Sequence, residues 1–191
     1  MDNFKAHETA VIDPGCIIGE GTQIWHFSHI MTGSKLGMNC NIGQNVVVSP
    51  GVILGNGVKV QDIVSIYTGV TCDDDVFLGP SCVFTNVINP RSFISRKDEF
   101  KATHVGKGAT IGANATIVCG NNIGNYALVG AGAVVTRPIP PFALVTGNPA
   151  RQTGWVSKYG HKLDFDYNGR ACCPESGEWY RFSDGVVISE G

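Results

Sequence analysis

The feature that most constrains this chain is an apolar residue at every sixth position. One series runs from Ile12 to Phe84 and a second, in a shifted register, from Val105 to Val135. The members are Ile12, Ile18, Ile24, Ile30, Leu36, Ile42, Val48, Leu54, Val60, Ile66, Cys72, Leu78 and Phe84, then Val105, Ile111, Ile117, Ile123, Val129 and Val135. A period of six matches neither the 3.6-residue turn of an α-helix nor the two-residue alternation of a strand. The chain is therefore predicted to be built from six-residue units.

The other positions of the unit indicate a triangular coil. The residue four after each apolar one is mostly small or β-branched, and glycine, asparagine or aspartate often falls between the two. Those three residue types favour tight turns. If each side of a triangle is a short strand, three units make one turn of 18 residues, and successive turns stack about 4.8 Å apart as parallel strands. The nineteen units then predict about six turns of an all-β solenoid, whose handedness the spacing leaves open.

The repeat is interrupted once, between Phe84 and Val105. We expect residues 85–104 to form an excursion loop, because long insertions in compact domains usually serve a function. Five of the chain's fourteen lysine and arginine residues lie between Arg91 and Lys107. Such a segment is either a solvated loop or a site for an anionic ligand, since arginine suits phosphate and carboxylate groups.

The C-terminal part departs from the repeat. Pro138, Pro140 and Pro141 follow Val135, and proline cannot donate to a strand ladder, so we expect the solenoid to end there. The predicted organisation is a coil domain over residues 1–151 and an extension over 152–191. Within the extension we expect a short helix over 154–161 and a β-hairpin over 178–189 that turns at 183–185. The adjacent Cys172 and Cys173 do not form a zinc signature, because no second pair of ligands follows.

Composition excludes several classes of protein. A formal net charge of −2 argues against a nucleic-acid partner, and no apolar run approaches the roughly 20 residues of a membrane span. The N-terminal residues lack the apolar stretch of a signal peptide. Seven scattered cysteines do not suggest a disulfide framework. We therefore expect a cytoplasmic protein that does not insert into membranes.

The segment from Ala109 to Arg151 carries a resemblance to a known family. It contains paired Ile-Gly units, the run Val-Gly-Ala-Gly-Ala-Val-Val-Thr-Arg, a Pro-Pro turn and Gly-Asn-Pro-Ala-Arg. This pattern resembles the C-terminal signature of the hexapeptide-repeat acyltransferases. Two further stretches, 24–29 (Ile-Trp-His-Phe-Ser-His) and 84–91 (Phe-Thr-Asn-Val-Ile-Asn-Pro-Arg), are similar to those of the UDP-2-acetamido-3-amino-2,3-dideoxyglucuronate N-acetyltransferases.

The resemblance implies a left-handed coil, a homotrimer and acetyl-CoA as co-substrate, bound in a groove between neighbouring subunits. It also implies that the acceptor is the 3-amino group of a UDP-linked amino sugar, a uronate, for bacterial surface polysaccharide such as O-antigen. Another nucleotide-linked amino sugar is the alternative acceptor. The sequence does not decide between these acceptors.

Site residues follow from the same resemblance. Ala113 and Ala131, one turn apart, match the positions where backbone amides approach the pantetheine arm, and Arg137 and Arg151 match basic positions facing the CoA phosphates. Simple turn packing is the alternative explanation of the two alanines. The residues assigned to the acceptor are Asn86, Arg91, Phe93, Arg96, Lys97, His29 and Tyr67.

The expected mechanism departs from the family pattern. Many members place a catalytic histidine early in the excursion loop, where this chain has Asn86 to Asn89, and the only loop histidine, His104, lies at the far end. A sugar amine is partly neutral near pH 7, so orientation can replace a strong base. We expect Asn86 to orient the amine for direct attack on the thioester, although a loop-stabilising Asx turn would also explain an asparagine there.

Three other functions compete with this interpretation. A γ-type carbonic anhydrase would bind zinc through three histidines, and His26, His29 and His104 are the candidates, but that family lacks the pattern over 134–151 in this form. A purely structural or ice-binding solenoid would repeat threonine on one flat face, which this chain does not. O-acetylation would need the missing loop histidine. We expect no catalytic metal.

Overall fold

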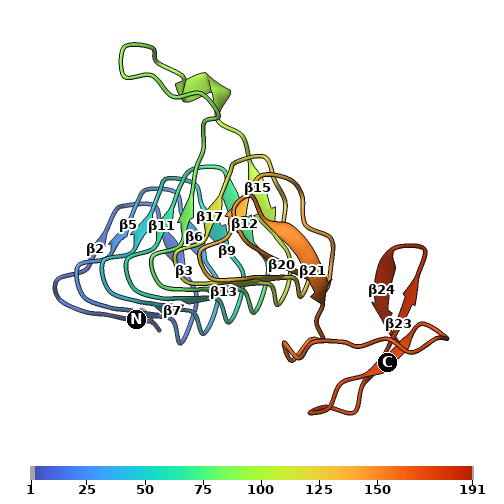
Figure 1. Cartoon of the computed structure of the whole chain (residues 1–191). Helices are drawn as coiled ribbons and strands as arrows, with labels where there is room; N and C mark the ends of the chain where they lie inside the picture. Colours follow the sequence, from blue (N-terminus) through green and yellow to red (C-terminus); the bar gives the residue numbers. More distant parts are fainter. Residues whose placement is uncertain (1–2, 191) are drawn as a thin grey trace.

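The chain winds into a left-handed parallel β-helix of about eight turns (Figure 1). The structure is a computed structural model that describes residues 3–190. Paired residues on successive turns lie 18 positions apart, as where Lys59 pairs with Asn41 on one side and Phe77 on the other. The predicted fold and the predicted 18-residue turn are therefore confirmed.

Three parallel sheets form the faces of the coil. Sheet A contains β1 (Lys5–Ala6), β4 (Gln23–Ile24), β7 (Asn41–Ile42), β10 (Lys59–Val60), β13 (Phe77–Leu78), β16 (Thr110–Ile111), β18 (Leu128–Val129) and β20 (Ala143–Thr146). Sheet B contains β2 (Val11–Ile12), β5 (His29–Ile30), β8 (Val47–Val48), β11 (Ser65–Ile66), β14 (Val83–Phe84), β17 (Thr116–Ile117) and β19 (Val134–Val135). Sheet C contains β3 (Ile17–Ile18), β6 (Lys35–Leu36), β9 (Ile53–Leu54), β12 (Val70–Cys72) and β15 (Thr103–Val105).

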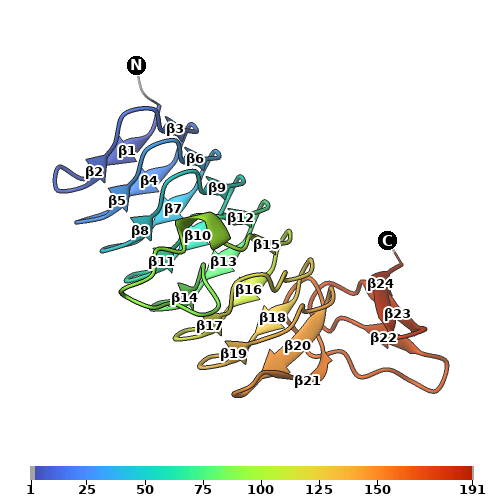
Figure 2. The same cartoon turned by 90° about the horizontal axis from the view of Figure 1, so that it is seen from above.

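The chain visits the sheets in the order A, B, C on every turn, so the coil has three corners. Corner AB joins sheet A to sheet B, corner BC joins sheet B to sheet C, and corner CA closes the turn. Figure 2 shows the strands stacked along the coil, with the N-terminus at one end and the C-terminal strands at the other.

The period-six residues form the core. From Ile24 to Val135 every one of them is buried, whereas Ile12 and Ile18 at the open N-terminal end are half-buried. The residue three after each of them, apart from Phe84 and Val135, takes a left-handed backbone conformation, as at Asn45 with φ 54° and Gly51 with φ 73°. This explains the turn-forming residues of the repeat, because glycine and asparagine enter that region at little cost.

The structure extends the coil beyond the predicted six turns. Lys5 and Ala6 pair with β4 at one end, and Leu144 and Val145 pair with β18 at the other. The prolines after Val135 do not end the solenoid as expected, because they lie in the last turn, where Ile139 still donates its N–H to Asn122 and accepts from Gly124. The excursion ends at residue 102 rather than 104, since Thr103 and His104 belong to β15.

The prediction of a short helix over 154–161 is wrong. Residues Arg151–Trp155 instead form β21, which pairs antiparallel with β20. The outer edge of β20 offers unpaired backbone groups, so an extended strand there satisfies hydrogen bonds that a helix would leave unmade. A turn follows, in which the Ser157 hydroxyl accepts hydrogen bonds from the N–H groups of Tyr159 and His161.

The extension closes with a small antiparallel sheet. The strands β23 (Trp179–Ser183) and β24 (Val186–Ser189) form the expected hairpin, and β22 (Arg170–Cys172) adds a third strand. Tyr180 is fully buried against Phe142. Burial alone would raise the pKa of Glu178, but hydrogen bonds from Lys158, Ser189 and Tyr180 outweigh it and lower that pKa to about 2. No helix among the described residues is long and apolar enough to cross a membrane.

Candidate functional site

Ala113 and Ala131 lie next to each other at corner AB, on adjacent turns of the coil. Thr110 pairs with Leu128 and Ile111 with Val129 in sheet A, and the Gly132 N–H donates to the Ala113 carbonyl at 2.8 Å. The two alanines therefore occupy the same position on adjacent turns, as their 18-residue spacing predicted.

The amide groups at this position are available to a ligand. Elsewhere in the coil a side chain one turn further along accepts the equivalent N–H: at corner AB Asp62 accepts from Gln44 at 2.8 Å, and at corner CA Asp74 accepts from Asn56 at 2.7 Å. One turn beyond Ala113 and Ala131 stand Ala131 and Gly147, which have no side-chain acceptor. Within residues 3–190 the N–H groups of Ala113 and Ala131 therefore have no hydrogen-bond partner. Two free donors on adjacent turns are a site for carbonyl or anionic oxygen atoms.

Arg137 and Arg151 lie together at the C-terminal end of the coil. Both line one small pocket there, with Pro138, Pro140 and Ala150. Arg151 donates from Nη1 to the Ala150 carbonyl at 3.0 Å. Both arginines are exposed, so the pocket presents two guanidinium groups, which suit phosphate.

The excursion loop leaves the coil at corner BC, after β14, and stands away from it (Figure 1). Arg91, Arg96 and Lys97 line one pocket within the loop. Arg96 is held by Glu99, which accepts two hydrogen bonds at 2.7 and 2.9 Å. Phe93 is 82 % exposed and does not line this pocket. The structure thus gathers the three predicted cations but leaves Phe93 outside.

Asn86 marks the base of the loop. Its carbonyl accepts the Lys101 N–H at 2.9 Å, which ties the outgoing and returning strands of the loop together. The side-chain amide makes no hydrogen bond to any residue that the structure describes, so it does not form the Asx turn considered as an alternative. The Asn86 amide is free to contact a substrate.

Tyr67 and His29 lie on earlier turns. Tyr67 precedes Thr85 by one turn at corner BC, because β11 pairs with β14, and its side chain is 40 % exposed. His29 lies on the outer face of sheet B, where its Nε2 is 2.9 Å from Asp13 Oδ1. That hydrogen bond lowers the pKa of Asp13. Tyr67 is therefore close to the loop base, whereas His29 lies nearer the N-terminal end of the coil.

A single chain does not bring all of these groups together. Asn86 and the loop lie at corner BC, whereas Ala113 and Ala131 lie at corner AB, on the opposite edge of sheet B. The outer face of sheet B between them carries no lysine, arginine, aspartate or glutamate. Its outward residues are Val11, His29, Val47, Ser65, Val83, Thr116 and Val134.

The three histidines considered as zinc ligands do not converge. His26 lies at corner AB and stacks on His7, His29 pairs with Asp13 on sheet B, and His104 lies 3.0 Å from Asp73 on sheet C. Within residues 3–190 no group of three or more histidine, cysteine, aspartate or glutamate side chains is placed to hold a metal ion. His104 also lies outside the loop, on β15.

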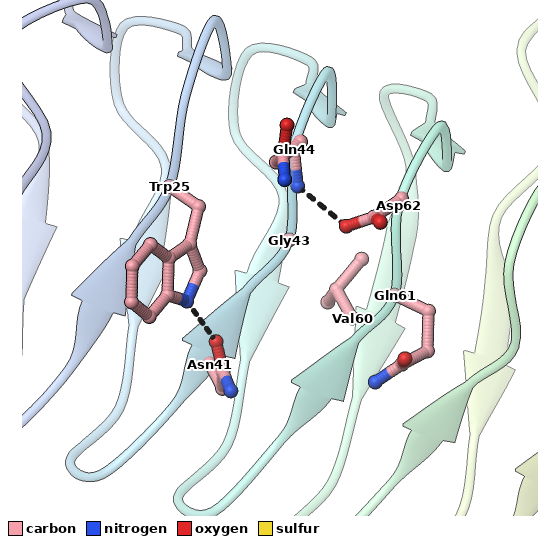
Figure 3. A pocket seen from close by; sticks show the side chains of 7 residues that line it. All are labelled: Trp25, Asn41, Gly43, Gln44, Val60, Gln61 and Asp62. Atoms are coloured by element: carbon pink, nitrogen blue, oxygen red, sulfur yellow. Dashed lines mark hydrogen bonds between the residues drawn. The ribbon is translucent and has the colours of Figure 1, made fainter.

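A further pocket at corner AB was not assigned from the sequence. Trp25, Asn41, Gln44 and Gln61 line it, together with Gly43 and Asp62 (Figure 3). The available signal was Trp25 itself, because it occupies a position that is glycine on many turns, and its indole is 41 % exposed.

Comparison with known proteins gives two family matches. The model described as "Bacterial transferase hexapeptide (six repeats)" matches residues 3–50, and that described as "Hexapeptide repeat of succinyl-transferase" matches residues 103–137. The dTDP-3-amino-3,6-dideoxy-α-D-galactopyranose 3-N-acetyltransferase of Aneurinibacillus thermoaerophilus is 46 % identical over 188 residues, which cover 96 % of each chain.

Solved structures have the same fold. A hexapeptide-repeat acetyltransferase from Vibrio cholerae, complexed with acetyl coenzyme A, matches with a TM-score of 0.51 and 25 % identity, covering 65 % of this chain and 72 % of the other. The acetyltransferase domain of PglB from Neisseria gonorrhoeae matches with a TM-score of 0.52 and 24 % identity, covering 77 % of this chain and 56 % of the other.

Proposed function

Because the chain belongs to the hexapeptide-repeat acyltransferase family, we propose that it transfers the acetyl group of acetyl-CoA to the 3-amino group of a nucleotide-linked sugar. The observation that carries this proposal is the 46 % identity, over nearly the full length, to a sugar-nucleotide 3-N-acetyltransferase. The acyltransferase activity itself is common to the family.

Acetyl-CoA would lie along corner AB. The free N–H groups of Ala113 and Ala131 would donate hydrogen bonds to oxygen atoms of the pantetheine arm and of the thioester. Arg137 and Arg151 would bind the phosphates at the end of the coil. A larger side chain at either alanine would occupy the space that the arm needs.

The site would be completed between two subunits of a homotrimer. Suppose that three chains pack around a threefold axis with sheet B of each chain facing that axis. Corner BC of one chain then meets corner AB of its neighbour, because a cyclic interface joins the two different edges of this face. The uncharged outer face of sheet B suits burial in such an interface. Asn86 of one subunit would then face the free amides of the next.

The reaction would proceed by direct attack. The neutral amine adds to the thioester carbonyl, an N–H of Ala113 or Ala131 stabilises the developing oxyanion, and the C–S bond breaks as the tetrahedral intermediate collapses. The Asn86 side-chain carbonyl accepts a hydrogen bond from the amine and aims its lone pair. The departing CoA thiolate takes the surplus proton, so no acyl-enzyme forms and no metal is required.

The identity of the acceptor divides into two candidates. The motifs over 24–29 and 84–91 favour a UDP-linked 3-amino uronate for O-antigen synthesis, and the cluster of Arg91, Arg96 and Lys97 supports an acceptor with a diphosphate and a carboxylate. The identity to the Aneurinibacillus enzyme favours a dTDP-linked 3-amino-3,6-dideoxyhexose instead. We propose the cytoplasm as the compartment, because all seven cysteines are free thiols and thiols persist in reducing surroundings.

Steady-state kinetics with both acceptors tests the proposal. Asn86→Ala is expected to lower kcat/KM by about ten- to a thousandfold while CoA affinity is unchanged, since one positioning or oxyanion contact contributes about 1.4 to 4 kcal/mol. His104→Gln is the matched control and should have little effect. If His104→Gln abolishes turnover and Asn86→Ala is nearly silent, the direct-attack mechanism is wrong. If neither amino sugar is acetylated by the wild-type enzyme, the proposed substrate class is wrong.

A further inference from the structure

We propose that the pocket around Trp25 binds the nucleobase of the acceptor, and that this base is a pyrimidine dione, uracil or thymine. The inference rests on the proposed function and specifies which part of the substrate meets which part of the coil. It concerns the pocket lined by Trp25, Asn41, Gly43, Gln44, Gln61 and Asp62, here called the Trp25 pocket.

One side of the Trp25 pocket is an aromatic ring, and Gly43 leaves the space beside that ring open. The Trp25 ring lies within 8° of parallel to the His26 ring, and His26 stacks on His7 with ring centroids 3.6 Å apart. In Figure 3, Trp25 and Gln61 stand on either side of Gly43. A Cβ at Gly43 would lie 2.6 Å from Asp62 Oδ1 and 2.8 Å from its backbone nitrogen, so close packing of the turns requires a glycine. Because Gly43 has no side chain, the space between Trp25 and Gln61 is left open and can take a flat ring.

The remaining walls offer amide groups to the edge of that ring. Trp25 Nε1 donates to Asn41 Oδ1 at 2.7 Å, which directs the Asn41 amide nitrogen outward as a free donor. The side-chain amides of Gln44 and Gln61 have no partner among residues 3–190. An amide pairs through one donor and one acceptor with the carbonyl oxygen and N3–H of uracil or thymine. Cytosine also offers a donor and an acceptor to an amide that turns over, but the Asn41 nitrogen, whose oxygen is held by Trp25, can only donate. That donor suits the O4 oxygen of uracil or thymine and not the amino group that cytosine has in its place.

The charge of the Trp25 pocket excludes the phosphates as its occupant. Its lining contains one carboxylate, Asp62, and no lysine or arginine. A diphosphate would be repelled by that carboxylate, whereas a neutral base is not. The cations proposed for the diphosphate lie in the excursion loop, on Arg91, Arg96 and Lys97.

The position of the Trp25 pocket fits the length of the substrate. A continuous ladder of hydrogen bonds along corner AB joins Ala113 to Gln44: the Asn114 N–H donates to Pro80, that of Ser81 to Asp62 and that of Ile63 to Gln44. Three turns separate the thioester site from the Trp25 pocket, or about 14 Å at about 4.8 Å a turn. A diphosphate and a pentose separate the hexose from the base over a similar length.

Calorimetry with UDP, dTDP, CDP and GDP tests the inference on the intact enzyme. UDP or dTDP is expected to bind at least about tenfold more tightly than CDP and GDP. Trp25→Ala should weaken that binding by about five- to a hundredfold, because stacking on an aromatic side chain contributes about 1 to 3 kcal/mol per base. CoA affinity should stay at the wild-type value, which shows that the variant is folded.

Trp179→Ala is the matched control, because Trp179 is similarly exposed, at 45 %, but lies in the C-terminal sheet. Gln61→Ala should weaken the binding of UDP and dTDP, because the base edge loses one hydrogen-bonding amide. If Trp25→Ala and Gln61→Ala both bind UDP and dTDP like wild type while amino sugars are still acetylated, the base binds elsewhere and this inference alone fails. If the wild-type enzyme binds no nucleotide, the inference and the proposed acceptor class both fail.

Discussion

Mixed trimers give the most direct test of a site shared between chains. Asn86→Ala removes the group proposed to hold the amine, and Ala131→Trp fills the space proposed for pantetheine. Each variant alone should be nearly inactive, because every site of its trimer lacks one half. The two positions lie at opposite edges of sheet B, so in a trimer packed through that sheet one site takes Asn86 from one chain and Ala131 from the next.

The expected recovery follows from counting. In an equal random mixture of the two variants, a chain with native Asn86 occurs at about one half of positions, and its neighbour has native Ala131 with the same frequency. About one quarter of sites are then intact, so activity should reach about one quarter of wild type. If each site were formed within a single chain, no site would be intact and the mixture would be as inactive as its parents.

Co-expression of equal amounts of the two chains with one affinity tag common to both keeps the random mixture, and a chromatographic assay for the acetylated sugar nucleotide then measures this recovery. A second mixture serves as control: wild type with the doubly substituted chain should retain about one quarter of the activity if sites are shared, but about one half if they are not. Recovery near zero in the first mixture together with one half in the second would refute the shared site.

Four further outcomes are expected. Ala131→Trp should weaken CoA binding at least about tenfold in calorimetry and leave nucleotide binding intact, and equal CoA affinity would remove the alanines from the cofactor site. Gly112→Ala should lower stability in thermal unfolding by about 1 to 3 kcal/mol, because its Cβ would lie 2.5 Å from the Ala131 nitrogen, whereas Gly154→Ala, whose nearest neighbour would be 3.8 Å away, should not. Burial opposes the lowering of the Glu178 pKa, but the hydrogen bonds of this carboxylate reduce its pKa from 4.5 to about 2, so its contribution to stability is present above about pH 4.5 and lost as the pH falls toward 2. Glu178→Gln should therefore cost the C-terminal sheet about 1 to 2 kcal/mol at pH 7, after allowance for solvent screening. The same variant should flatten the acid dependence of stability when unfolding is followed by tryptophan fluorescence. Treatment with a chelator should leave acetyl transfer unchanged, and loss of activity that zinc restores would contradict the mechanism.

The repeat made most of the coil predictable from sequence. An inward residue such as Ile66 or Leu78 is identified by its period alone, because a shift of one position would turn it outward. Counting the units in threes from Ile12 also assigns each corner, provided that the excursion replaces one ordinary turn between sheets. On that count Asn86 and Ala113 belong to different corners, so their separation could have been predicted.

Other features depend on contacts between distant segments. The strand β21 replaces the expected helix because β20 offers it a free edge, and nothing within residues 151–155 records that partner. The prolines after Val135 remain within the coil because they lie in its last turn, where a missing donor costs little. The 18-residue spacing places the residues of the Trp25 pocket on three adjacent turns, but the pocket itself required the structure, because it depends on side-chain directions such as the hydrogen bond from Trp25 to Asn41.

The ladder along corner AB has a consequence for how the molecule opens. Each turn exchanges hydrogen bonds only with the turns before and after it, so local opening spreads from the ends of the coil rather than through a single cooperative core. The half-buried Ile12 and Ile18 make the N-terminal end the easier one to fray. Amide exchange should therefore slow separately at the two ends, near Trp25 when nucleotide binds and near Ala131 when CoA binds, so that one protein reports the occupancy of each substrate independently.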